Sequence, residues 1–127
     1  MIEFIDIHKS FGAKSVLRGV TIGVDAGKVL YIIGASGAGK SVLVKHLVGL
    51  IRPDAGRIIL DGEDITQLSE SQFYRIRRKC AMVFQHSTLF DSMSLIENVA
   101  LPYRKHFDMT RGESRRAAEE KLELVQM

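Results

Sequence analysis

The chain has 127 residues, of which 46% are hydrophobic and 26% are charged, with a formal net charge of +3. These values are typical of one soluble globular domain. No apolar run approaches the length of a membrane span, and the acidic start Met1–Asp6 does not resemble a secretory signal, so a cytoplasmic location is expected. The lone cysteine, Cys80, excludes an internal disulfide and is expected to be a small buried residue.

The first elements are predicted to be two strands. Ile2–His8 alternates apolar and polar residues as a half-buried strand does, and Val16–Val24 alternates more loosely. Ser10–Ser15, around Gly12, is typical of a turn between them. Asp25–Gly27 predicts a second turn, which leads out of this pair of strands.

A glycine-rich motif follows. Gly34–Ser41 matches the phosphate-loop pattern, which is a glycine, four free positions, and then Gly-Lys-Ser or Gly-Lys-Thr. The apolar run Val29–Ile33 predicts a strand covered on both faces before the loop, and Val42–Leu50 predicts a helix after it. A chance match in so short a chain is expected roughly a few times in a thousand. A phosphate loop is therefore favoured over a flexible glycine turn.

This motif indicates binding of a nucleoside triphosphate. Glycine permits backbone conformations in which amide groups wrap a phosphate closely, and the start of the following helix adds partial positive charge. The Lys40 ammonium is expected to reach the β- and γ-phosphates, and the Ser41 hydroxyl is expected to coordinate Mg²⁺. The residues expected to hold the nucleotide in this segment are Gly34, Ser36, Gly37, Ala38, Gly39, Lys40, Ser41 and Val42.

Short elements alternate with turns beyond the loop. Arg52–Gly56 is expected to end the preceding helix. Ile58–Leu60 then predicts a short strand, and Asp61–Gly62 predicts a tight turn. Ser69–Gln72 is typical of a capping box and predicts a helix that carries the basic cluster within residues 75–79. No aromatic residues interleave with these arginines, so a solvated helix face is favoured over a nucleic-acid surface.

Two further helices are predicted near the C-terminus. Ser94–Glu97 and Thr110–Glu113 both fit the capping-box pattern. Apolar residues of the second helix fall on one face, namely Ala118, Leu122 and Val125. The helical pattern continues to Met127 without a glycine, a proline or a terminating turn, which indicates an interrupted helix.

Several motifs together resemble those of a known family. Besides the phosphate loop they are Ser10–Gly12, Val16–Val20, Gly49–Leu50, Pro53–Gly56, Leu60–Gly62, Val83–Gln85, Leu89–Phe90 and Glu97–Pro102. In these motifs, which run nearly end to end, the chain resembles the N-terminal half of an ABC transporter ATP-binding subunit. The resemblance implies an α/β fold, a P-loop NTPase core of the ABC ATPase type with an N-terminal antiparallel β subdomain and the start of a helical subdomain. It implies a truncated core over residues 1–85 and an incomplete helical part over residues 86–127.

The resemblance also implies roles for individual residues. Phe11 resembles the aromatic that stacks on the adenine ring, with a strand-end core aromatic as the alternative. Gln85 resembles the glutamine that contacts Mg²⁺ or the attacking water and moves with the membrane partner. Lys40 and Gln85 are thus the implied catalytic residues, and Ser41 and Gln85 the implied metal contacts. The segment 86–93 is expected to contact a cytoplasmic helix of a permease.

Motifs of the full-length family are absent from the 127 residues. They are the serine-glycine-glycine-glutamine signature, an apolar strand that ends in Asp-Glu, and a histidine switch. We therefore expect these residues alone neither to hydrolyse ATP nor to form a stable domain. Val29–Ile33 and Ala81–Phe84 are expected to expose apolar faces and unpaired backbone groups, because the strands that lie beside them in the family's sheet are missing.

Within the family, Lys40–Lys45 and Glu97–Arg104 are most similar to ATPases of the Mce-linked phospholipid systems. Asp91 after Leu89–Phe90 favours that group, with an amino-acid importer or a lipoprotein-release system as alternatives. The implied ligands are ATP and Mg²⁺. The implied partners are a membrane permease and a second ATP-binding subunit, with no nucleic acid, at the inner face of the plasma membrane.

Two other classes stay open at this point. The first is a soluble ABC protein that acts on ribosomes or DNA, whose parent gene would carry a second cassette. The second is an unrelated P-loop kinase or GTPase. A GTPase would contain an Asn-Lys-x-Asp guanine motif, and the 127 residues contain none.

Overall fold

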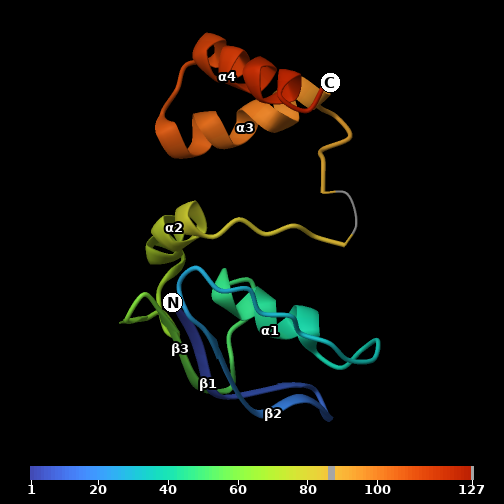
Figure 1. The fold of residues 1–127 in the computed structure, drawn as a ribbon, viewed down its shortest axis with the longest axis vertical. Coiled ribbons are helices and arrows are strands. Elements are labelled where there is room, and N and C mark those ends of the chain that lie inside the picture. Colours follow the sequence, from blue (N-terminus) through green and yellow to red (C-terminus); the bar gives the residue numbers. More distant parts are fainter. Residues whose placement is uncertain (86–87, 127) are drawn as a thin grey trace. The chain divides into compact units, whose positions relative to one another are not determined.

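The computed structural model describes residues 1–85 and 88–126, and the chain divides into two compact units, Met1–Ala81 and Met82–Met127. Most secondary structure lies in the first unit (Figure 1). Its elements are β1 (Ile2–Phe11), β2 (Lys14–Val24), α1 (Lys40–Leu47), β3 (Ala55–Leu60), β4 (Glu63–Asp64) and α2 (Glu70–Lys79). The second unit contains α3 (Leu95–Phe107) and α4 (Arg111–Glu123).

The strands of the first unit form one antiparallel sheet in the order β2-β1-β3-β4. Figure 1 shows the first three of them, with β1 between β2 and β3. Ile2 of β1 lies opposite Val24 of β2 and Leu60 of β3, so β1 has a hydrogen-bonded neighbour on each side. The predicted antiparallel β subdomain is therefore confirmed. β1 and β2 extend beyond the alternating segments that predicted them, because their pairing continues to the turn at Gly12.

A bulge in β1 determines which side chains enter the core. Strict alternation would place Phe4 and Ile7 on opposite faces, since they are three positions apart. Asp6 has a positive φ of 51°, and the register with both neighbouring strands shifts around it. The extra residue turns both Phe4 and Ile7 to the buried side. Gly56 of β3 packs directly against the bulge. A Cβ on Gly56 would lie 2.3 Å from the Asp6 carbonyl oxygen, so only glycine fits there.

The core of the first unit lies between the sheet and two helices. Leu43 of α1 and Phe73 and Ile76 of α2 pack against buried strand residues. The buried cluster is Phe4, Ile7, Leu17, Leu43, Ile58, Leu60, Ile65, Phe73 and Ile76. The helix that carries the phosphate loop is thus fixed to the sheet by its own apolar face.

Two segments predicted or expected to be strands are not strands in the structure. Val29–Ile33 and Ala81–Phe84 belong to no strand, and the exposed fractions of Tyr31, Ile33 and Val83 are 81%, 93% and 95%. The prediction that Val29–Ile33 is covered on both faces is therefore wrong for this chain. The expectation that both segments expose apolar side chains is confirmed. A strand needs a neighbour for its backbone groups, and the described residues provide none here.

The second unit is an antiparallel pair of helices (Figure 1). Both predicted capping boxes are present, since the Ser94 and Thr110 hydroxyls accept from the Glu97 and Glu113 amides. Ala118 and Leu122 are buried as expected, whereas Val125 lies beyond the end of α4 and is exposed. Within the described residues, no helix is both long and apolar enough to cross a bilayer.

Candidate functional site

The phosphate-loop motif forms a compact turn in front of α1. The Ala38 amide donates to the Ala35 carbonyl at 3.3 Å, and α1 begins at Lys40 rather than at the predicted Val42. Gly37 and Gly39 have positive φ angles of 78° and 93°. A side chain is strained in this left-handed region, so both positions favour glycine.

Gly39 also fixes the loop onto the sheet. A Cβ on Gly39 would lie 2.9 Å from Val16 Cγ1 and 2.9 Å from Leu17 Cδ2, both in β2. Such distances are shorter than real contacts allow, so the loop can lie this close to β2 only without a side chain. By contrast, a Cβ on Gly37 would meet no atom within 4 Å. The loop is therefore packed on one side and open on the other, as a cradle for a phosphate chain must be.

The charge distribution of this loop favours an anion. The Lys40 ammonium donates to the carbonyl oxygens of Gly34 and Ala35 at 2.6 and 2.7 Å, which holds its charge over the loop. The first turn of α1 contains no acidic residue. The exposed Ser41 follows in that turn, where the helix dipole contributes partial positive charge. The loop, Lys40 and the helix start thus present positive charge to the same place.

His46 is a buried polar residue on α1. Its side chain is 1% exposed, and Nδ1–H donates to the Val42 carbonyl at 2.6 Å. Nε2 is buried and has no hydrogen-bond partner in the described part of the chain. Burial lowers the pKa of His46 below its ordinary value of 6.5, and the nearby Lys9 charge lowers the pKa further. Burial therefore favours the neutral imidazole, which stabilises α1 through its bond to Val42.

Phe11 lies at the end of β1 and is 49% exposed. It does not belong to the core, so the alternative of a core aromatic is wrong. Lys9 Nζ lies 5.5 Å from the centre of the Phe11 ring. In the register Lys9 lies opposite Leu17, which Gly39 contacts. Phe11 is therefore an exposed aromatic at the end of the hairpin on which the phosphate loop packs.

Gln85 lies in the second unit, whereas the phosphate loop and Phe11 lie in the first. It is exposed at a bend that follows residues 82–84, which belong to no helix or strand. The structure thus brings the predicted nucleotide contacts together in one unit, except Gln85. Among residues 1–85 and 88–126, no three His, Cys, Asp or Glu side chains form a cluster able to hold a metal ion.

The segment predicted to contact a permease begins with residues 86 and 87, which lie outside the described residues. Leu89 and Phe90 are 54% and 55% exposed. Asn98 of α3 holds this segment, because its Nδ2 donates to the Phe90 and Met93 carbonyls at 3.1 Å and its Oδ1 accepts from the Phe90 amide at 2.7 Å. Sequence reasoning missed this role, although Asn98 lies in a motif that it identified.

The basic cluster of α2 makes contacts within the chain. Arg75 forms an ion pair with Glu63, and Arg77 forms one with Glu70. Arg77 Nε also donates to the Val48 carbonyl at 2.9 Å, which joins α2 to the end of α1. These arginines therefore stabilise the unit that carries the phosphate loop.

A model of the ABC transporter family matches residues 17–127. The chain belongs to this family. It is 43% identical over 124 residues to the probable ribonucleotide transport ATP-binding protein mkl of Mycobacterium leprae, and this match covers 98% of the chain and 36% of that protein. It is 42% identical over 125 residues to the methionine import ATP-binding protein MetN of Rhizobium johnstonii, with 98% and 34% covered.

Solved ABC cassettes have the same fold. A dimeric post-hydrolysis state of the ATP-binding cassette MJ0796, bound to ADP and Pi, matches with a TM-score of 0.87 and 28% identity, covering 100% of this chain and 58% of that one. The cassette cbiO1 of Clostridium perfringens matches with a TM-score of 0.75 and 25% identity, covering 96% and 49%. The chain therefore spans about half of a cassette, and about a third of the curated relatives that it matches.

Proposed function

We propose that this chain is the nucleotide-binding part of an ABC transporter ATP-binding subunit, which uses ATP binding and hydrolysis to drive transport through a membrane permease. The observation that carries the proposal is the loop itself. Gly39 packs against β2, and Lys40 holds its charge over the loop carbonyls. Membership of the family supports the rest of the proposal.

Each residue of the site then has a defined task. The amides of Gly37–Ser41 donate to phosphate oxygens, and the Lys40 ammonium exchanges its two carbonyl acceptors for oxygens of the β- and γ-phosphates. Phe11 offers an exposed ring for stacking on the base. Ser41 and Gln85 would contact Mg²⁺, which neutralises charge on the phosphates when it is bound.

Hydrolysis needs groups that these 127 residues do not contain. A general base must orient the attacking water, and a second subunit must complete the γ-phosphate site, since positioning and charge stabilisation carry this chemistry. The missing strands led us to expect no stable domain, but the first unit has a buried core of its own. We therefore propose that the chain folds and binds nucleotide, without turnover. The dimeric cassette with ADP and Pi supports a dimer as the active form.

The permease is proposed to dock on the segment from Leu89 to Met93. Leu89 and Phe90 expose apolar side chains, and the Asn98 contacts hold their backbone in one conformation. An exposed apolar cluster of this kind marks a binding surface. A cysteine at Ser92 would cross-link to the permease in the assembled complex. Absence of cross-links from every position in this segment would argue against coupling to a permease.

A phospholipid is the substrate that we propose. Support comes from Lys40–Lys45 and Glu97–Arg104, which resemble the Mce-linked lipid systems. Ribonucleotide and methionine are the competing substrates, because the names of the two matched relatives mention them. Each candidate substrate is added to the permease complex in lipid nanodiscs, and the one that stimulates ATPase activity is identified as the transported substrate. Stimulation by methionine or a ribonucleotide, but not by added phospholipid, would reject the lipid proposal. A cassette that copurifies with ribosomes and with no permease would reject transport.

Replacement of Lys40 tests nucleotide binding directly. Lys40→Ala removes a charge-assisted contact to phosphate, so the affinity for a fluorescent ATP analogue is expected to fall by about tenfold or more. Lys45→Ala is the matched control, because Lys45 lies in the last turn of α1 and is expected to leave the affinity unchanged. Circular dichroism checks that both variants keep the parent fold. Equal affinity of the parent and Lys40→Ala would show that the loop does not hold the triphosphate.

A further inference from the structure

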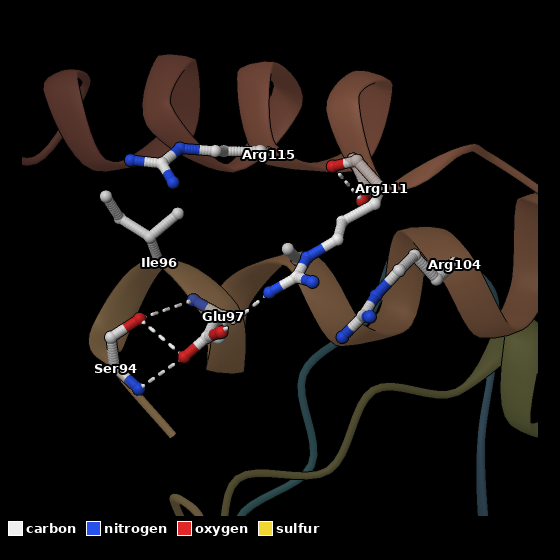
Figure 2. Close-up of a pocket in the computed structure, with 8 residues that line it drawn as sticks. Ser94, Ile96, Glu97, Arg104, Arg111 and Arg115 are labelled. Carbon is white, nitrogen blue, oxygen red and sulfur yellow. Dashed lines mark hydrogen bonds and ion pairs between the residues drawn. The ribbon is translucent and has the colours of Figure 1, made fainter.

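A pocket of about 170 Å³ lies between α3 and α4 in the second unit (Figure 2). Three arginines line it, one from α3 and two from α4, namely Arg104, Arg111 and Arg115. Glu97 is the one acidic residue among the lining residues. Positive charge therefore exceeds negative charge in the wall of the pocket.

Glu97 is already occupied by other partners. The Ser94 amide and hydroxyl both donate to Glu97 Oε2 at 2.9 Å (Figure 2). These bonds are the main reason why the pKa of Glu97 lies below its ordinary range, and the Arg111 and Arg104 charges lower the pKa further. Glu97 is therefore a carboxylate engaged in a helix cap, and it does not balance three guanidinium groups.

Arg104 is the arginine with an unsatisfied hydrogen-bond donor, although its charge acts on Glu97. Arg111 lies 3.5 Å from Glu97 Oε1, and Arg115 Nε donates to Glu119 at 2.9 Å. The Arg104 Nε–H is buried and has no hydrogen-bond acceptor among the described residues. A buried donor of this kind costs free energy unless an acceptor joins it. The two other arginines are largely exposed, with side-chain exposures of 85% and 67%, so both can turn towards a ligand.

We propose that this pocket binds a small phosphoryl-bearing anion, with Arg104 as its anchor. Guanidinium groups match phosphate oxygens with two parallel hydrogen bonds each. A phosphoryl group offers three acceptor oxygens and a charge between about −1.5 and −2 at neutral pH, which suits a pocket lined by three arginines from two helices. A carboxylate has two oxygens and one charge, so it satisfies this pocket less well. The site lies in the unit without the phosphate loop and does not depend on the proposed transport function.

Phosphate titration of the ¹⁵N-labelled 127-residue chain tests the proposal. Lys40→Ala is included in every sample, because the phosphate loop is a second expected phosphate site. We expect saturable shifts of the Ser94, Glu97 and Ser114 amides at low ionic strength, where ionic contacts are least screened. Arg104→Gln is expected to weaken this binding by about tenfold or more, since it removes a charged hydrogen-bond donor. Arg116→Gln, on an exposed position of α4 outside the pocket, is expected to leave the affinity unchanged.

Titrations with other anions and with a second variant distinguish the possible outcomes. Glycerol 3-phosphate in place of inorganic phosphate shows whether a headgroup-like ester or the free ion binds more tightly, and binding of either supports the site. Acetate that binds as tightly as phosphate would overturn the phosphoryl assignment. If Arg104→Gln disturbs the fold, the exposed Arg115→Gln provides the same test with an expected loss of about threefold. Unchanged affinity in the folded Arg variant, or no saturable shift in the parent, would overturn the proposal.

Discussion

Two apolar regions of this chain differ completely in what surrounds them. β1 has β2 on one side and β3 on the other, and its Ile7 is 0% exposed. Val29–Ile33 is more apolar than β1 and richer in β-branched residues, yet it forms no strand and its Ile33 is 93% exposed. The same residue type lies at both extremes of burial. Composition and β propensity therefore do not make a strand unless a neighbour pairs with its backbone.

The location of the second region gives this difference a functional meaning. Val29–Ile33 leads directly into the phosphate loop. This segment does not hold the loop in place. The loop is held by the contact of Gly39 with β2 and by the core residue Leu43 of α1. The antiparallel sheet and α1 thus support the loop, although the segment before it is unpaired.

Hydrogen exchange is the measurement with the largest expected contrast. Paired amides of β1, from Ile2 to Phe11, are expected to exchange at least about a thousandfold more slowly than amides of Val29–Ile33, because exchange in β1 requires unfolding of the sheet. Mass spectrometry of peptic fragments of the intact chain measures both segments in one experiment. Similar protection of the two segments would mean that Val29–Ile33 pairs with a strand in solution.

Matched isoleucine substitutions test the same contrast energetically. Ile7→Ala is expected to lower the free energy of unfolding by about 2 to 5 kcal/mol, because it leaves a cavity in the core. Ile33→Ala removes the same atoms from an exposed position and is expected to change it by less than about 0.5 kcal/mol. Urea unfolding followed by circular dichroism measures both variants. Equal losses would contradict the burial that separates these two residues.

Alanine substitutions of two glycines in the phosphate loop distinguish the effect of backbone strain from the effect of packing. Gly37→Ala and Gly39→Ala both place a Cβ on a residue with positive φ, which costs about 1 to 2 kcal/mol. Only the Cβ at Gly39 also meets Val16 and Leu17 at 2.9 Å. Gly39→Ala is therefore expected to destabilise the first unit by about 1 to 3 kcal/mol more than Gly37→Ala. If thermal unfolding ranks the two variants the other way, the loop does not pack on β2.

The smallest expected effect is a pH dependence caused by His46. The pKa of His46 is lowered by burial, so the unfolded chain binds more protons than the folded chain below the ordinary pKa of 6.5. The contribution of His46 to the free energy of unfolding is then fully present above that pH, and it decreases as the pH falls towards the pKa of the folded state. The slope reaches at most about 1.4 kcal/mol per pH unit. Lys9 and Asp54 are the charged groups that act on His46.

His46→Gln provides the comparison for this slope. Glutamine keeps a polar side chain beside the Val42 carbonyl but does not titrate. Urea unfolding between about pH 7.5 and 5.5 is expected to show a smaller decrease in the variant, and this window lies above the range in which carboxylates titrate. The same slope in both proteins would assign the pH dependence to other groups.

Local features of this chain were predictable because they depend on neighbours in the sequence. All three capping boxes, which begin at Ser69, Ser94 and Thr110, form the hydrogen bonds expected from their spacing. The phosphate loop also follows from sequence, because Gly37 and Gly39 adopt left-handed conformations that are open to glycine without strain. The strands β1, β2 and β3 were recognised from their patterns, with one end of each placed correctly and the other two or three residues short.

The tertiary structure alone decided features that depend on distant residues. The bulge at Asp6 brings Phe4 and Ile7 to one face, which alternation in the sequence does not indicate. The contact between Gly39 and β2 joins residues that are separated in the chain, and so does the pocket that Arg104 shares with the arginines of α4. Burial of His46 and exposure of Ile33 likewise depend on which elements pack around them. Sequence determines the preferences of each segment, but free energy is gained only where another segment covers it.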